Sequence, residues 1–332
     1  MARTVNGAFE EFLKESVNLD PNDTSSARSS RDWLVKQINI LPSKHAGFLD
    51  IYEEVHIHYG SFARRTKIRE LDDLDIIIGL KSLGATYVDS GDAVQITVPS
   101  NSAFQALCHD NSLLLNSRRV INTFVKALSD VPQYARAELK RNGSAAVLNL
   151  SSYPWSFDIV PGFFTTPESD GRTYYVIPNG SGHWMKTDPR VDQARVPRIN
   201  QANGGHVLAP LRLIKYWNRR PTMPTIPSYL LECMVLNYYE YRNDASQYPD
   251  IEVISLLLYI AGAVLSSVQD PKKIQGDINS LDWDERLAIH TRASQDARRA
   301  SSARELEASG DHQGSIRKWG EIFGPAFPEY TI

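Results

Sequence analysis

The stretch GSFARRTKIRELDDLDIIIG, residues 60–79, decides the fold that this sequence predicts. It opens with a Gly-Ser pair and ends in a run of branched apolar residues that is typical of a buried strand. Asp73 and Asp75 stand two apart at the head of that run, so a strand would place both carboxylates on the same face. Carboxylates that converge repel each other unless a cation lies between them, and Mg²⁺ prefers hard oxygen ligands. The pattern therefore predicts a magnesium site where this strand begins.

Two further features fit a site for phosphate and metal. Gly60-Ser61 follows the alternating stretch Val55–Tyr59 and precedes a segment in which a helix can begin, so its backbone N–H groups can approach a phosphate. Asp158 lies in another apolar run, Trp155–Val160, where an unpaired carboxylate would be costly. A metal ion would remove that cost, and a partner arginine would do so equally well. Gly-Ser alone is an ordinary turn, so the weight lies in the combination of these features and their order.

Two alternatives for the metal site were weighed against this set. Asp72 competes with Asp73, but on a strand it would point to the opposite face from Asp75. His56 and His58 also share a strand face, although packing or exposure to solvent explains them better than a metal does.

Composition sets broad limits on the function. The 332 residues are 42% hydrophobic and 23% charged, which suits two ordinary globular domains. A net charge of −3 disfavours a constitutive nucleic-acid binder, because such proteins usually carry a basic excess. Cys108 and Cys233 are far apart and lack a metal-ligand pattern, so we expect neither zinc nor a disulfide framework. The N-terminus has no apolar run that would form a secretory signal, and the expected location is the cytoplasm.

The order of patterns predicts an α+β protein whose second half is helical. In the first half we expect strands at 55–59, 74–80, 92–99, 145–150, 155–160 and 174–177, and helices at 31–41 and 117–128. Residues 22–31 are polar and read as a loop or a helix start. From about residue 200 helical spacing dominates, at 208–218, 229–241, 251–268 and 284–309. The Gly/Pro/Asn-rich stretch between Pro167 and Asn203 holds the expected boundary, placed so that the domains are 1–185 and 186–332.

These motifs resemble those of the cyclic GMP-AMP synthase and oligoadenylate synthetase superfamily, and most of all its bacterial branch. That branch is the CD-NTases, also called SMODS-type nucleotidyltransferases. The motifs GSFARRTKI and FDIVP are typical of it, and the resemblance continues in the segments LRLIKYWN, IPSYLLE and WGEIFGPAFP. It spans roughly residues 55 to 328.

The resemblance implies roles for residues in the helical half. Lys215 would contact the triphosphate, Ser228 would bind phosphate, and Tyr229 would stack on a base. The residues alone leave other readings open. Lys215 could extend along an apolar stripe to solvent, Ser228 could only cap the helix that follows it, and Tyr229 could belong to the core.

The fold implied is a nucleotidyltransferase (polymerase beta-like) core with a mixed sheet, followed by an oligoadenylate synthetase-like helical domain, with the active site in the cleft between them. Asp73 and Asp75 would bind two Mg²⁺ ions, with Mn²⁺ as an alternative, and Asp158 would complete the metal site. Gly60, Ser61, Lys215 and Ser228 would hold the donor triphosphate.

The reaction implied joins NTPs, ATP among them, into a cyclic di- or trinucleotide with release of pyrophosphate. This product is a second messenger of bacterial antiviral defence, and the partners implied are operon-encoded regulatory or effector proteins. Activation by DNA is not implied, because the chain lacks both a zinc motif and a basic excess. Three rival functions remain: a transferase that modifies RNA, protein or an antibiotic, a linear oligoadenylate synthetase, and a catalytically silent nucleotide-binding scaffold.

Overall fold

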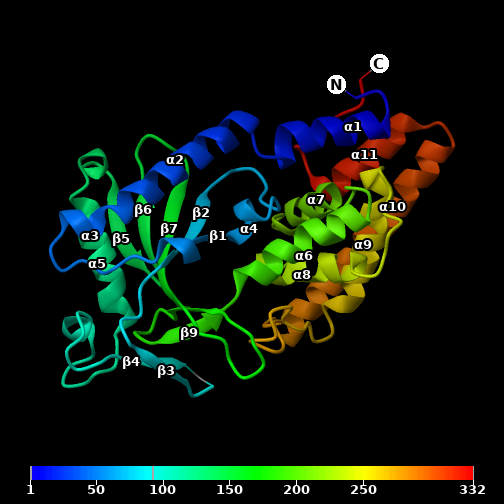
Figure 1. Ribbon diagram of the computed structural model, residues 1–332. Coiled ribbons are helices and arrows are strands. Elements are labelled where there is room, and N and C mark those ends of the chain that lie inside the picture. Colours follow the sequence, from blue (N-terminus) through cyan, green and yellow to red (C-terminus); the bar gives the residue numbers. More distant parts are fainter. Residues whose placement is uncertain (1, 92, 332) are drawn as a thin grey trace. The chain divides into compact units, whose positions relative to one another are not determined.

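The computed structural model describes residues 2–91 and 93–331, and its contacts group the chain into two compact units (Figure 1). The sheet unit comprises Pro21–Ala63 and Leu71–Arg190, and the helical unit comprises Met1–Asp20, Arg64–Glu70 and Val191–Ile332. Each unit is therefore discontinuous in sequence, whereas the sequence suggested a single division at residue 185. The assignment of 1–185 and 186–332 as domains stays a prediction.

The sheet unit is built around a parallel pair of strands, β2 (Asp73–Gly79) and β7 (Ser156–Phe164). The strand β1 (Ile57–Tyr59) runs antiparallel to β2, and β6 (Ala145–Asn149) runs antiparallel to β7. Figure 1 shows these four strands side by side. The described strands follow the order β1-β2-β7-β8-β9-β4-β3, with β6 and β5 branching from β7. The others are β3 (Thr86–Asp89), β4 (Val94–Thr97), β5 (Glu138–Asn142), β8 (Tyr175–Pro178) and β9 (Trp184–Thr187).

This mixed sheet with helices confirms the α+β class. The run Ile76–Ile78 in β2 is fully buried, as expected for a central strand covered on both faces. The strand predicted at 92–99 is β4, and Asp92 itself lies outside the described residues. The helices of this unit are α2 (Pro21–Asn39), α3 (Leu41–Lys44), α4 (Gly60–Ala63) and α5 (Ser117–Ser129), with 3-10 turns at Glu53–Val55, Gln105–Leu107 and Pro132–Tyr134.

The polar segment 22–31 is helical, because α2 already begins at Pro21. Ala27, Leu34 and Ile38 are fully buried and recur at helical spacing, so one face of α2 packs into the core. The Ser, Asn and Asp residues around them obscure this stripe in the sequence.

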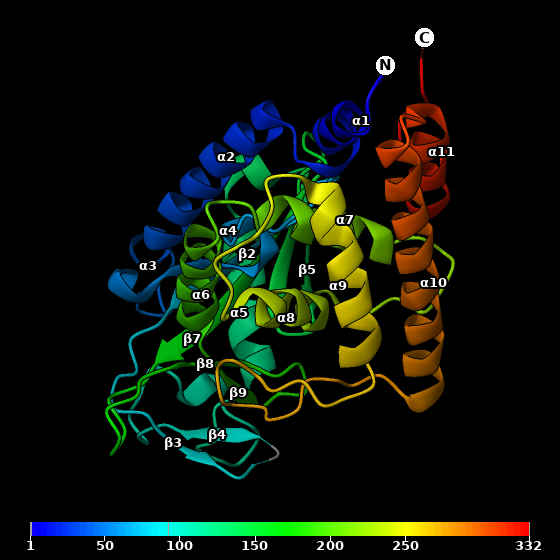
Figure 2. The same ribbon diagram turned by 90° about the vertical axis from the view of Figure 1, so that its right-hand side faces the viewer.

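The helical unit contains α1 (Val5–Phe12), a π-helical segment (Leu13–Val17) and most of α6 (Pro189–Ala202). It continues with α7 (Leu208–Asn218), α8 (Ser228–Tyr239), α9 (Pro249–Ala263), α10 (Trp283–Ala308) and α11 (His312–Phe323). The stretch expected to hold the boundary thus contains a helix, α6, with Pro197 inside it. Figure 2 shows α9 and α10 alongside each other, where Arg304 of α10 binds Asp250 of α9 at 2.6 Å. Buried alanines on α10, at 293, 297 and 300, permit this close approach.

Within residues 2–91 and 93–331, no helix combines the length and the apolar character needed to span a membrane.

Candidate active site

The register of the central strands brings two of the predicted carboxylates to neighbouring positions. Asp75 of β2 lies opposite Asp158 of β7 in the parallel pairing, and Asp73 lies opposite Ser156. Along β2, Leu74 is buried while Asp73 and Asp75 are half-buried, which is the alternation that the sequence predicted. The backbone therefore places all three aspartates on two adjacent strands.

Tyr59 lies beside these carboxylates and was not singled out from the sequence. It is the last residue of β1 and pairs with Asp75 across the antiparallel register. Burial raises the pKa of the Tyr59 phenol, and the negative charges of Asp75, Asp158 and Asp73 raise it further. All three carboxylates act on this one hydroxyl, so they lie in the same region of the sheet unit. The raised pKa keeps the Tyr59 hydroxyl protonated.

The donor chemistry of this region fits Mg²⁺, since three carboxylates supply hard oxygen ligands from adjacent strands. In the part of the chain that the structure describes, however, no three His, Cys, Asp or Glu side chains are gathered as a ready-made metal cage. Like charges separate by rotating about their side-chain bonds, whereas the strand register fixes their Cα positions. To hold a cation together, these carboxylates would have to move closer to one another by side-chain rotation.

Gly60 makes the closest approach to these aspartates. Its φ is +74°, and a Cβ atom built there would lie 1.7 Å from Oδ2 of Asp75. A side chain at this position would displace the carboxylate, so glycine is required for both its backbone conformation and its size. Gly60 and Ser61 open the short helix α4 directly after β1, as the sequence predicted.

Lys215, Ser228 and Tyr229 all belong to the helical unit. Ser228 is exposed and is the first residue of α8, with Pro227 at the cap position and no side-chain hydrogen bond there. The expectation that Ser228 caps this helix is therefore wrong, because the chain turns into the helix one residue earlier.

Tyr229 is held by charged partners that the sequence did not reveal. Its hydroxyl donates to Oδ1 of Asp192 at 2.9 Å and accepts from Nζ of Lys272 at 2.7 Å. The Lys272 ammonium also lies 3.9 Å from the centroid of the ring, a cation–π contact. Burial raises the pKa of Tyr229, and so does the nearby Asp192. The half-buried ring also packs against the core, so the reading as a core residue applies to part of it.

Lys215 does not extend to solvent, since only 7% of the residue is exposed, and that alternative is wrong. Its ammonium lies 3.5 Å from Oε2 of Glu232, a buried residue of α8. Glu232 is also bound by Arg64 at 2.5 Å and by the hydroxyl of Thr66 at 2.7 Å. Burial alone would raise the pKa of Glu232, but the Arg64 and Lys215 charges hold it below its ordinary value. Lys215 is thus part of a buried ionic cluster, which local sequence patterns do not show.

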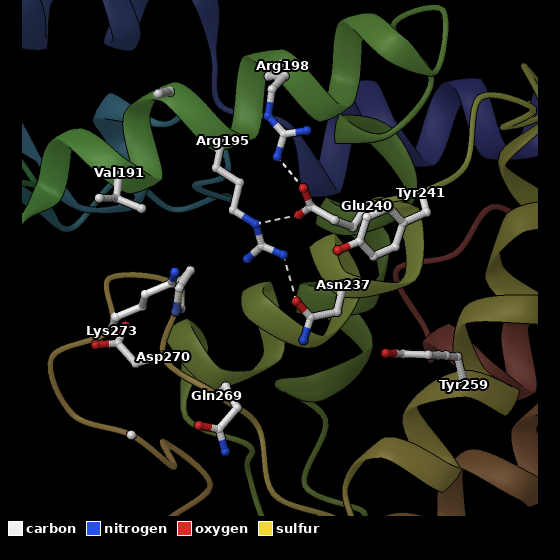
Figure 3. Close-up of a pocket in the computed structure, with 13 residues that line it drawn as sticks. Val191, Arg195, Arg198, Asn237, Glu240, Tyr241, Tyr259, Gln269, Asp270 and Lys273 are labelled. Carbon is white, nitrogen blue, oxygen red and sulfur yellow. Dashed lines mark hydrogen bonds and ion pairs between the residues drawn. The ribbon is translucent and has the colours of Figure 1, made fainter.

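A separate cavity of about 1120 Å³ lies in the helical unit, lined by residues of α6, α8, α9 and the connection that follows α9. Figure 3 shows Arg195 and Arg198 directed toward the same carboxylate, Glu240, with Arg195 also bound to Asn237 at 2.6 Å. None of the residues predicted from the sequence lines this cavity. Neither Lys215 nor Glu232 lines it, so the cavity is distinct from the Lys215 cluster.

No established family profile matches the chain. A Bacillus cereus (strain VD146) protein described as a probable cyclic nucleotide synthase is 40% identical over 336 residues, covering 99% of both chains. The solved structure of CdnC from E. coli MS115-1 with ATP matches with a TM-score of 0.69 at 16% identity, over 97% of this chain and 98% of that one. The complex of that CdnC with HORMA-deltaN matches with a TM-score of 0.68 at 18% identity, over 97% of each chain. The structural matches confirm the nucleotidyltransferase fold, and with the full-length sequence identity they show that the chain belongs to the bacterial CD-NTases, the nucleotidyltransferase family of cyclic nucleotide synthases.

Proposed function

We propose that the protein joins NTPs, ATP among them, into a cyclic di- or trinucleotide by two-metal nucleotidyl transfer with release of pyrophosphate. The observation that carries the proposal is the parallel register of Asp75 and Asp158, together with the approach of Gly60 to Asp75. Such a group of carboxylates beside a glycine that begins a helix suits a metal-bound triphosphate.

In this mechanism Asp73 and Asp75 would hold two Mg²⁺ ions, or Mn²⁺ in their place, and Asp158 would complete the site. Bound there, the ions would supply charge neutralisation at the reacting phosphate and acidify the attacking hydroxyl. Asp158 helps to remove the proton from that ribose hydroxyl. The backbone at Gly60 and the hydroxyl of Ser61 donate to the phosphates, and Tyr59 stays neutral next to the carboxylates.

The helical unit supplies the remaining contacts to the donor nucleotide. Lys215 and Ser228 bind its triphosphate and Tyr229 stacks on its base. The fixed hydroxyl of Tyr229 supports this role, since Asp192 and Lys272 hold the ring in one orientation. A preoriented ring loses less freedom when a base stacks on it.

The solved relatives suggest substrates and partners. CdnC of E. coli was solved with ATP and in complex with HORMA-deltaN, and we propose ATP and an operon-encoded regulatory protein for this chain by analogy. The cyclic product would act as a second messenger in antiviral defence and activate an effector protein. Activation by DNA is not part of the proposal, because the net charge of −3 offers no general basic excess.

Changing Lys215 or Tyr229 to alanine should weaken binding of a non-hydrolysable ATP analogue by about 1–3 kcal/mol each. The first change removes a charge-assisted contact to phosphate, and the second removes the stacking surface. Titration calorimetry measures both effects. Lys318→Ala and Tyr241→Ala serve as matched controls, since Lys318 pairs with Glu321 on α11 and Tyr241 is 97% exposed. Unchanged affinity in the Lys215 and Tyr229 variants would separate these residues from the nucleotide site.

The function itself is tested by incubating the purified protein with the four NTPs and Mg²⁺ or Mn²⁺, and measuring release of pyrophosphate. Parallel samples contain the proteins encoded beside its gene, so that a regulated enzyme is not mistaken for an inactive one. Turnover of nucleotides alone supports the proposal. Covalent attachment of a nucleotide to added RNA, protein or antibiotic favours a transferase on those acceptors, and nucleotide binding without turnover in every sample favours a silent scaffold.

A further inference from the structure

We propose that Glu232 is a positioning residue that holds Lys215 in place, so that the ammonium N–H groups of Lys215 remain available to the donor triphosphate. The inference rests on the proposed function and adds to it a residue that would not itself touch the nucleotide. It concerns only contacts inside the helical unit.

Glu232 is a deeply buried carboxylate. Only 2% of Glu232 is exposed, and a buried carboxylate is costly unless charged or polar groups satisfy it. Glu232 stands one helical turn after Ser228 on α8, and its partners Arg64 and Thr66 come from the segment that follows the Gly60-Ser61 pair. The residues that directly follow the Gly60-Ser61 pair in the chain thus supply two of the groups that bind the Glu232 carboxylate.

The three partners of Glu232 lie at different distances from its carboxylate oxygens. Arg64 takes Oε1 at 2.5 Å and Thr66 takes Oε2 at 2.7 Å, both full hydrogen bonds. The Lys215 ammonium lies 3.5 Å from Oε2, beyond the usual range for an N–H···O bond. Arg64 and Thr66 make the short hydrogen bonds to the two carboxylate oxygens, and Lys215 contacts Oε2 at a longer distance.

Lys215 lies among several charged side chains. The charged groups that face the Lys215 ammonium are Glu232 from α8, and Arg64 and Lys67 from the segment Arg64–Glu70. The charge of Asp192 also acts on Arg64, so the cluster contains charges of both signs. Glu232 is the carboxylate that faces the Lys215 ammonium, and its attraction restricts where that ammonium can lie.

The same groups determine how Lys215 titrates. Burial lowers its pKa, Arg64 and Lys67 lower it further, and Glu232 raises it. Without the Glu232 charge the pKa of Lys215 must fall. Only protonated Lys215 attracts phosphate strongly, so affinity is present below this pKa and is lost as the pH rises through it. Removal of the Glu232 charge should move that loss to lower pH.

The experiment compares Glu232→Gln with the wild type by titrating a non-hydrolysable ATP analogue from about pH 6 to pH 10, a range that brackets a lowered lysine pKa. We expect the affinity of the variant to begin to fall at a lower pH than that of the wild type. At the alkaline end, the dissociation constant of the variant should exceed that of the wild type by about tenfold for each unit by which the pKa of Lys215 is lowered. Glu240→Gln is the matched control, because Glu240 also bridges two cations, Arg195 and Arg198, but away from Lys215 (Figure 3). It should keep the wild-type profile. An unchanged profile for Glu232→Gln, or the same displacement in both variants, would overturn the proposal.

A second variant tests the geometry if Glu232→Gln fails to fold. Thr66→Val keeps the shape of a fully buried residue but removes the hydroxyl that occupies Oε2. Lys215 should then move closer to Oε2 of Glu232 and be less available to phosphate. Affinity for the analogue should therefore fall several-fold at neutral pH. Wild-type affinity in a folded Thr66→Val variant would contradict the positioning role. Failure of the wild type to bind any nucleotide would instead contradict the proposed function itself, so the two failures are distinguishable.

Discussion

Replacing Asp73 and Asp75 together by alanine is expected to lower turnover at least about a hundredfold, because several kilocalories per mole of transition-state stabilisation depend on the metal ions. The fold should persist, since Leu74 and Ile76, which anchor β2 in the core, are unchanged. Removing two like charges from one strand face should leave the melting temperature in the absence of metal unchanged or higher. Pyrophosphate release and thermal unfolding measure the two effects.

Asp72→Asn is the matched control for this double variant. Asp72 precedes β2, is exposed, and offers its backbone carbonyl to the amide of Ser156, a bond that the substitution keeps. It should retain most of the activity. Retention of more than a few per cent of activity by the double variant would show that the metal assignment is wrong.

Gly60→Ala should cause a loss of comparable size without removing any charged group. The new Cβ atom would be built 1.7 Å from Oδ2 of Asp75, so the carboxylate must turn away from its position. The positive φ of +74° adds backbone strain of about 1–3 kcal/mol. Turnover and thermal unfolding, measured on the same preparation, separate the two consequences.

Gly171→Ala controls for the strain alone. Gly171 has a φ of +81°, and nothing lies within 4 Å of its added Cβ atom. Both variants should lose stability through backbone strain, Gly60→Ala more because of the clash with Asp75, while only Gly60→Ala should lose turnover. Equal activities in the two variants would mean that the approach of Gly60 to Asp75 has no part in catalysis.

Structural features that depend on a short repeat along the chain could be predicted from the sequence. Two-residue alternation was enough to place Asp73 and Asp75 on one face of a strand, and β2 confirms this placement. The pairing of Asp75 with Asp158 joins strands about eighty residues apart, which no local pattern specifies. There the resemblance to a known family provided what periodicity could not.

The features that were missed depend on tertiary contacts. Glu232 stands in an apolar helix, and only the folded chain shows that Arg64 and Thr66 satisfy it. Asp192 and Lys272 meet at Tyr229 from distant parts of the chain, so no spacing could indicate them. Residues 22–31 read as a loop or a helix start because Ser, Asn and Asp compete with the helical backbone, and burial of the α2 face overrides that preference.

The central claim is that the product is a ring, and its susceptibility to alkaline phosphatase tests this most directly. A linear oligonucleotide keeps a terminal 5′-phosphate that the phosphatase removes, whereas a ring of two or three nucleotides has none. Products formed from labelled NTPs and Mg²⁺ are treated with phosphatase, separated and weighed by mass spectrometry, with the Asp73 and Asp75 double variant as the blank. We expect a short product whose migration does not change and whose mass equals that of its nucleotide monophosphates less one water for each linkage. If every product shifts after phosphatase treatment, the cyclase account is contradicted and a linear oligoadenylate-type synthetase takes its place.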